Sequence, residues 1–311
     1  MYAIEVENAR KEYGAVTALD GLSLRVERGE TVGLLGTNGA GKTTLFELLV
    51  GLRSPDAGSV AVLDRDPTDG VATRRRVGYL PEHAGFPDEL TGREVLRFHA
   101  RMRGVDAERR DHRVARVLET VGLTDAADRR VEGYSNGMAR RLGLGTVLVA
   151  DPAVLLLDEP TAGLDPYGVE AFHDVLGAVA SAADVTVVFS SHVLGEVEAL
   201  CDRAAVVHGG RVVTDGDVDA LRRQTEENVT VRATMGSDGD ADSAAERLRS
   251  RDGVERATED GAELVVECTP TRAFAVLEAI RESGDVERFT VREPGLESAF
   301  RTAVADRGER A

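Results

Sequence analysis

The amino-acid sequence predicts an α/β protein: a core with an antiparallel β subdomain and a helical insertion, followed by a small C-terminal α+β domain. Three observations predict this fold. A strand-like run at 31–35 leads through a glycine-rich loop into a helix-like run at 45–52. The continuous apolar run at 154–157 is typical of a central parallel strand. Strand-like and helical runs alternate towards the C-terminus, which predicts a first domain of residues 1–222 and a second of residues 226–311.

The glycine-rich loop fits the phosphate-binding pattern G-x-x-x-x-G-K-S/T. Its residues are Gly36, Thr37, Asn38, Gly39, Ala40, Gly41, Lys42, Thr43 and Thr44. Glycines adopt backbone angles that side chains forbid, so we expect the loop amides to turn inward around an anion at a helix N-terminus. Lys42 is placed to neutralise β- and γ-phosphate oxygens, and the Thr43 hydroxyl to bind Mg²⁺. A chance glycine-rich turn is the alternative, but the flanking strand and helix favour a P-loop NTPase core.

Polar side chains end two of the predicted core strands. Asp158 and Glu159 follow the apolar run at 154–157, and His192 follows a second run at 185–191. Ligands bind at the carboxyl ends of strands in open α/β sheets. Asp158 is therefore a candidate to bind Mg²⁺ through water, and Glu159 is a candidate base that orients the attacking water. Solvated strand ends and a structural histidine are the alternatives; beside a phosphate site, His192 is a candidate γ-phosphate sensor.

Two other positions have both a structural and a functional interpretation. Tyr13 lies between strand-like runs at 3–7 and 22–26, so that it is either a half-buried loop aromatic or a ring stacked on a nucleotide base. The P-loop favours stacking. Ser135 and Gly137 lie in a turn before a helix-like segment, where the serine is either an N-cap or part of a second anion-binding turn.

Apolar spacing predicts the helical insertion and the C-terminal domain. Residues 91–122 have helical spacing after a capping-box pattern that begins at Thr91. In the C-terminal domain the order β-α-β-α-β indicates half of a ferredoxin-like unit. Its strands are expected at 229–233, 264–267 and 289–292, and its helices at 243–251 and 271–283. No catalytic constellation is evident in this domain.

Charge and composition exclude some function classes. The chain has 311 residues, a hydrophobic content of 42% and a formal net charge of −17. Because a phosphate backbone repels so acidic a chain, no nucleic-acid partner is expected. Among the 38 basic residues only Lys11 and Lys42 are lysines, and an acidic, lysine-poor composition resembles that of proteins from salt-loving organisms. A high-GC genome is the alternative for the scarcity of lysine, although it does not account for the excess of acids.

Cysteine usage and hydropathy bear on location. Cys201 and Cys268 are far apart in sequence and form no C-x-x-C pair, which indicates a reducing cytoplasm. No N-terminal signal segment is visible. The longest mostly apolar stretch, 142–157, is interrupted by Asp151 and Pro152, so the chain is expected to have no transmembrane segment of its own. If the function involves a membrane, another chain supplies the span.

In this order, the motifs of residues 1–222 resemble the nucleotide-binding subunit of ATP-binding-cassette (ABC) transporters. Segment 134–138 resembles the family's signature, 154–159 its Walker B strand and 163–165 its D-loop, with His192 as the switch histidine. The resemblance implies nucleotide contacts from Tyr13, Ser135, Gly137 and Asp165 besides those of the P-loop. It further implies hydrolysis of ATP with Mg²⁺ by a homodimer, or by a pair with a related ATPase subunit. An integral-membrane permease would hold the pair at the cytoplasmic face of the cell membrane.

One departure and one refinement belong to this resemblance. Glu82 stands where the family usually has a glutamine that contacts Mg²⁺ and the γ-phosphate; its extra charge either strengthens the metal contact or points outward. The refinement is a resemblance to exporter ATPases with a short C-terminal domain, and among them to the subunit that serves copper-site maturation of nitrous oxide reductase. The segments that carry it are 78–82, 90–94, 128–130 with 134–138, and 294–297.

Two other function classes fit the sequence less well. Soluble ABC proteins that act on ribosomes or DNA usually join two cassettes or carry long coiled-coil insertions, whereas this chain has one P-loop and no sustained heptads. A nucleotide-gated switch without catalysis would not need Glu159, the candidate catalytic carboxylate. The sequence therefore favours the ATPase subunit of a transporter, with export as the expected direction.

Overall fold

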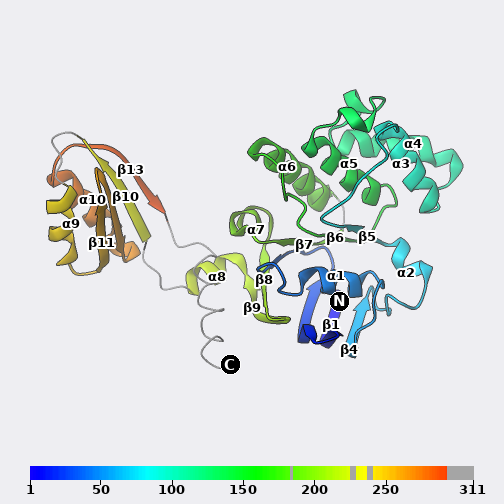
Figure 1. The fold of residues 1–311 in the computed structure, drawn as a ribbon, viewed down its shortest axis with the longest axis horizontal. Coiled ribbons are helices and arrows are strands. Elements are labelled where there is room, and N and C mark those ends of the chain that lie inside the picture. The colour runs from blue at the N-terminus through cyan, green and yellow to red at the C-terminus, as the bar shows by residue number, and fades with distance from the viewer. Residues whose placement is uncertain (183–184, 225–228, 237–240, 293–311) are drawn as a thin grey trace. The chain divides into compact units, whose positions relative to one another are not determined.

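The computed structural model describes residues 1–182, 185–224, 229–236 and 241–292. The chain divides into two compact units, Met1–Val218 and Asp219–Ala311, each with its own hydrophobic core (Figure 1). All candidate site residues belong to the first unit. Segment 294–297, which contributed to the narrower resemblance, lies outside the described residues.

A six-stranded sheet forms the centre of the first unit. Its order is β5-β6-β7-β3-β8-β9; β9 is antiparallel to β8, and the other neighbours are parallel. The strands are β3 (Thr31–Leu35), β5 (Val77–Leu80), β6 (Val154–Leu157), β7 (Thr186–Ser191), β8 (Arg203–His208) and β9 (Arg211–Asp217). All residues of β3, β6 and β7 are buried, as expected for parallel strands covered on both faces. Since these three strands are neighbours, their carboxyl ends meet, and the P-loop lies beside both strand-end motifs.

An antiparallel sheet of order β2-β1-β4 shares a core with the central sheet and with helix α1. Its strands are β1 (Tyr2–Tyr13), β2 (Val16–Glu27) and β4 (Ala57–Val62), and α1 spans Lys42–Leu49. Phe46 of α1 is fully buried between the sheets. The strands predicted at 3–7 and 22–26 fall within β1 and β2, which extend further because main-chain pairing continues through polar residues to Tyr13 and Val16.

The helical insertion consists of α3 (Gly92–Met102), α4 (Ala107–Thr120) and α5 (Asn136–Leu148), which pack on one another (Figure 1). The predicted capping box is confirmed: the Thr91 hydroxyl accepts a bond from the Glu94 amide, and the Glu94 carboxylate accepts one from the Thr91 amide. The other helices up to residue 224 are α2 (Val71–Arg75), α6 (Pro166–Ala182), α7 (Leu194–Leu200) and α8 (Val218–Gln224). Within the described ranges, no helix combines the length and the apolar character that a bilayer span requires.

From residue 229 to 292, the residues of the second unit that the structure describes form a four-stranded antiparallel sheet with two α-helices. Its elements are β10 (Val229–Met235), α9 (Ala241–Arg249), β11 (Val254–Asp260), β12 (Glu263–Cys268), α10 (Ala273–Glu282) and β13 (Val286–Arg292). The strands lie in the order β11-β12-β10-β13, and the elements follow one another along the chain as β-α-β-β-α-β. Both orders are those of a complete ferredoxin-like unit rather than half of one. The prediction missed β11 because Val254 and Ala257 are its only apolar residues, as befits a strand at the sheet edge.

Candidate active site

The P-loop joins β3 to α1, and its glycines serve different purposes. Gly39 and Gly41 adopt left-handed angles, with φ of 82° and 108°. The constraint at Gly36 differs from the one expected: its φ is ordinary, but an added Cβ would lie 2.6 Å from the carbonyl oxygen of Val207. Gly41 caps α1, so the loop runs directly into a helix N-terminus, where free amides and the helix dipole favour an anion.

A pocket of about 360 Å³ lies over the P-loop. Its wall consists of Tyr13, Val16, Thr17, Ala18, Thr37, Asn38, Gly39, Ala40, Gly41, Lys42, Thr43, Thr44, Glu82 and Glu159. The fold thus joins the P-loop to three candidates from other segments, Tyr13, Glu82 and Glu159. The Tyr13 ring is 38% exposed, with the Arg53 guanidinium 5.6 Å from its centroid. An exposed ring at the wall is compatible with base stacking, which stays a prediction.

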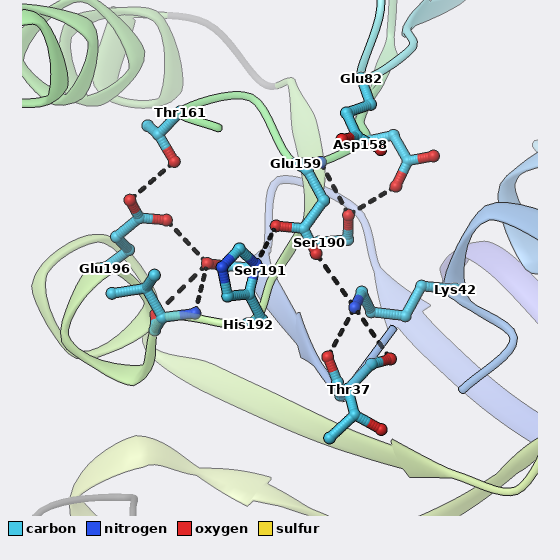
Figure 2. Close-up of polar contacts among 12 residues, drawn as sticks. Thr37, Lys42, Glu82, Asp158, Glu159, Thr161, Ser190, Ser191, His192 and Glu196 are labelled. Atoms are coloured by element: carbon cyan, nitrogen blue, oxygen red, sulfur yellow. Dashed lines mark hydrogen bonds and ion pairs between the residues drawn. The ribbon is translucent and has the colours of Figure 1, made fainter. Parts of the chain in front are cut away.

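Glu159 lies between the P-loop lysine and the strand-end histidine (Figure 2). Its Oε1 is 3.0 Å from Nζ of Lys42, and its Oε2 is 2.8 Å from Nδ1 of His192. Lys42 also donates a hydrogen bond of 2.6 Å to the carbonyl oxygen of Gly36. The side chains of Lys42 and Glu159 are 6% and 10% exposed, whereas that of His192 is 55% exposed. A buried carboxylate held by two nitrogen atoms is oriented as a base for an adjacent water requires.

The backbone of Glu159 is strained. Its φ is 41°, a left-handed angle that is unusual for a residue with a Cβ, and Pro160 restricts it further. Ser190, at the end of the neighbouring strand β7, holds this segment: its hydroxyl accepts a bond of 2.9 Å from the Glu159 amide and donates one of 2.7 Å to Oδ1 of Asp158. The strand-end serine thus orients both carboxylate residues.

Asp158 and Thr43 are the kinds of donor that suit Mg²⁺ bound mainly through phosphate and water. The Asp158 side chain is almost fully buried, and Thr43 is exposed at the pocket wall. Among the described residues no group of three or more histidine, cysteine, aspartate or glutamate side chains is arranged to hold a metal. One carboxylate and one hydroxyl are what Mg²⁺ takes from protein when it keeps its waters and substrate phosphates. The residues therefore fit this ion.

Sequence analysis missed the buried carboxylate Glu196, which ties two loops together (Figure 2). Glu196 accepts a bond of 2.6 Å from the Thr161 hydroxyl and one of 2.7 Å from the Ser191 hydroxyl. Thr161 is two residues after Glu159, and Ser191 precedes His192, so Glu196 links the segments that carry the base and the histidine. An acid four residues after a strand-end histidine, inside an amphipathic helix, was the available signal.

Sequence analysis also missed Arg140, a buried arginine in α5. Its guanidinium donates to main-chain carbonyl oxygens of the loop after β5 and of the segment after β6. Burial lowers the pKa of Arg140 from 12.5 to about 10, although the negative charges of Asp158 and Glu82 oppose this shift. The only signal in the sequence was a pair of arginines, Arg140 and Arg141, before the apolar part of a helix.

The remaining candidates, Ser135, Gly137 and Asp165, do not line the P-loop pocket. Ser135 is the N-cap of α5, as the structural interpretation predicted: its hydroxyl accepts a bond of 3.3 Å from the Met138 amide. Asp165 accepts a bond of 2.7 Å from the amide of Gly168 at the start of α6. A Cβ added to Gly137 would lie 3.5 Å from Cα of Gly168, so the first turns of α5 and α6 are adjacent.

A glycine loop that caps a helix, a buried lysine and a strand ending in two carboxylates define a P-loop nucleoside triphosphatase. Residues 19–162 match the family model described as ABC transporter. The chain is 44% identical over 225 residues to the daunorubicin resistance ATP-binding protein DrrA3 of Streptomyces coeruleorubidus. The aligned region covers 72% of this chain and 71% of the relative. It is 38% identical over 248 residues to the Nod factor export ATP-binding protein I of Bradyrhizobium diazoefficiens, which covers 79% and 80%.

A solved structure shares the fold at a lower sequence identity. The protein cbiO1 from Clostridium perfringens, part of the ABC transporter complex cbiONQ, superposes with a TM-score of 0.65 at 28% identity, over 72% of this chain and 94% of that one. The chain therefore belongs to the ABC transporter family as an ATP-binding subunit. Members of this family hydrolyse ATP and act with partner subunits, and this chain is an ATPase of that type.

Proposed function

We propose that the chain is the ATP-hydrolysing subunit of an exporter whose membrane permease is a separate protein. The observation that carries the hydrolytic part is the position of Glu159, buried at the pocket wall between Lys42 and His192. The direction of transport is supported by the relatives, which are associated with daunorubicin resistance and with Nod factor export.

The site residues divide the work of hydrolysis. Lys42 and the P-loop amides bind the β- and γ-phosphates, and the Tyr13 ring stacks on the adenine. Because the γ-phosphate competes with Glu159 for the Lys42 ammonium, nucleotide binding frees this carboxylate to orient water and accept its proton. His192 keeps the freed carboxylate in place through Nδ1. Thr43 and Asp158, the latter through water, would hold Mg²⁺, which would neutralise phosphate charge, and Glu82 lies at the pocket wall with Thr43.

A second copy, or a related ATPase subunit, is proposed to complete the site. Ser135 and Gly137 are exposed or half-exposed, and neither lines the pocket of its own P-loop. A hydroxyl and free amides at a helix N-terminus are suited to phosphate oxygens. In a two-fold pair, Ser135, Gly137 and the neighbouring Asp165 of one copy would face the nucleotide of the other. Because both chains are acidic, they meet at this face only when ATP bridges them. Closure of the pair therefore requires nucleotide, and hydrolysis lets the pair open.

The proposal also includes a permease partner and a role for the C-terminal unit. Since no described helix is suited to span a bilayer, we place the chain at the cytoplasmic face, bound to an integral-membrane permease. The first domain, 1–222, holds the whole nucleotide site, so the second, 226–311, serves assembly or regulation. The relatives favour a small organic substrate for the permease over copper-site maturation of nitrous oxide reductase.

The pairing is tested by size-exclusion chromatography of purified protein in high salt. The Glu159→Gln variant keeps the pocket but hydrolyses slowly, so it should elute as a dimer with ATP and Mg²⁺ and as a monomer with ADP. The double variant Glu159→Gln with Ser135→Arg should stay monomeric with either nucleotide, because the larger side chain blocks the face. Glu159→Gln protein that binds ATP yet stays monomeric at high concentration would speak against the two-fold site.

A further inference from the structure

Five main-chain carbonyl oxygens converge on one buried guanidinium. Nε of Arg140 donates to the oxygen of Pro160 at 2.6 Å. Nη1 donates to the oxygens of Pro81 and Glu82, both at 2.8 Å. Nη2 donates to the oxygens of Asp158 and Glu159, at 2.9 Å and 3.2 Å. The five N–H groups of the side chain are therefore all used, and the residue is 9% exposed.

These carbonyl oxygens belong to two separate loops of the candidate site. Pro81 and Glu82 follow β5, whereas Asp158 to Pro160 follow β6. The oxygens of the two loops repel one another and have lost water, so their convergence requires a cation with several donors. Within the part of the chain that the structure describes, Arg140 forms no salt bridge with a carboxylate side chain. Its hydrogen-bond partners are these carbonyl oxygens, and the charges of Asp158 and Glu82 favour its protonated form.

Arg140 also belongs to the helix whose N-terminus is proposed to contact the partner's nucleotide. It lies five residues after Ser135, in the second turn of α5. A rigid helix thus carries the capping serine at its start and, one turn later, the guanidinium that holds both loops. A displacement of α5 by its contact with nucleotide would be transmitted through these five hydrogen bonds to the two loops that carry Glu82 and Glu159.

We infer that Arg140 is a positioning residue for hydrolysis: it fixes the main chain of Glu159 and of Glu82 to helix α5, so that the base is aligned only when α5 is in place. This inference rests on the proposed roles of Glu159 and Ser135. Lysine is a poor substitute, because its compact ammonium has three donors and cannot span two loops as the planar fork does. Misplacement of a catalytic group by about 1 Å can cost about 10²-fold in rate.

The next residue provides a matched control. Arg141 is also in α5 and also donates to main-chain oxygens, those of Val121 and Gly122, at 3.0 Å and 3.1 Å. Neither acceptor belongs to the candidate site. Arg140→Lys and Arg141→Lys therefore remove the same chemical group from one helix. The five main-chain acceptors of Arg140 belong to the loops of the candidate site, whereas the two acceptors of Arg141 do not.

The test measures kcat for ATP, normalised to the number of ADP-binding sites, and the ADP dissociation constant in the full chain. We expect Arg140→Lys to lower kcat by about 10²-fold with ADP affinity changed by less than about twofold, and Arg141→Lys to change both by less than about twofold. Equal kcat per binding site in the two variants would overturn the inference. A merely structural role lowers the number of ADP-binding sites but not the turnover of each.

Two measurements distinguish an error in the role inferred for Arg140 from an error in the proposed function and from loss of nucleotide binding. Glu159→Gln in the same assay reports on the proposed function itself: if it turns over like the unmodified chain, the base is wrongly assigned whatever Arg140 does. Should Arg140→Lys bind no ADP, hydrogen exchange of the unmodified chain decides. Addition of a slowly hydrolysed ATP analogue with Mg²⁺ should slow exchange of the amides at 82–84, 159–162 and 136–141 together. Protection of one loop without the other two segments contradicts the coupling.

Discussion

Nζ of Lys42 lies 3.0 Å from Oε1 of Glu159, so the cation of the P-loop and the carboxylate at the end of β6 form a buried ion pair. Lys42 opens helix α1, which follows β3, and Glu159 follows β6; β7 separates the two strands in the sheet. The pair satisfies two charges that would otherwise be costly to bury. It also gives the phosphate-binding group a partner before any nucleotide arrives, and binding of ATP has to exchange this partner for phosphate oxygens.

A double-mutant cycle tests the ion pair. Lys42→Met removes the ammonium from a buried carboxylate and should lower the free energy of unfolding by about 3 kcal/mol. Adding Glu159→Gln to this variant should restore most of the loss, because a neutral amide no longer needs the ammonium. Urea unfolding of the nucleotide-free protein gives all four values. Additive effects of the two substitutions would mean that the side chains do not interact in solution.

Glu159→Gln alone is expected to retain ATP binding and to lose about 10²- to 10⁴-fold in kcat, since an amide accepts no proton from water. Steady-state ATPase assays measure kcat, and nucleotide titration measures the affinity for ATP. A matched control is Glu170→Gln, an exposed glutamate on α6, which should leave both unchanged. Turnover of Glu159→Gln within a few-fold of the unmodified chain would remove Glu159 from the mechanism.

His99 makes the stability of the helical insertion depend on pH. Its ring lies against Phe98 and Phe86, with centroids 5.6 Å and 6.3 Å away. Burial, and then the charge of Arg103, lower the pKa of His99 below its ordinary 6.5. The unfolded chain therefore binds the proton more readily, so this contribution to stability is present above pH 6.5 and is lost as pH falls through the lower, folded pKa.

The experiment compares thermal unfolding at about pH 7.5 and about pH 5.5, a range in which histidine titrates. The drop in melting temperature should be smaller in His99→Gln than in the unmodified chain. The control is His112→Gln, which alters an exposed histidine on α4 and should keep the full drop. An identical pH dependence in His99→Gln and the unmodified chain would refute the assignment.

The nucleotide site should survive removal of the C-terminal unit. Every residue of the P-loop pocket precedes Val218, where the first compact unit ends. A chain that ends at Arg223 is expected to fold and to bind ATP with an affinity close to that of the full chain, while it loses assembly or regulation. Calorimetric titration with ATP measures this directly. Folded protein without ATP binding would show that the second unit contributes to the site.

The features that were predicted from sequence are those encoded by residues close together in the chain. The P-loop, the buried runs of β6 and β7 and the capping box at Thr91 each depend on residues within one short window. Arg140 was missed because it bonds to main-chain atoms, which no pattern of side chains encodes. Glu196 was missed because its role depends on linking Ser191, five residues away, to Thr161, 35 residues away. Strand β11 escaped because an edge strand needs few apolar residues.

The left-handed φ of 41° at Glu159 determines which residues at this position would favour the stability of the fold. Glycine, and to a lesser degree asparagine, adopts that angle without the cost that glutamate bears before a proline. Because Glu159→Gly alone would leave the Lys42 ammonium buried without its carboxylate, a library screened only for heat resistance should enrich glycine at position 159 together with a neutral residue at position 42, a chain that turns over no ATP. A strained glutamate is what this position is expected to carry if its carboxylate is needed for hydrolysis.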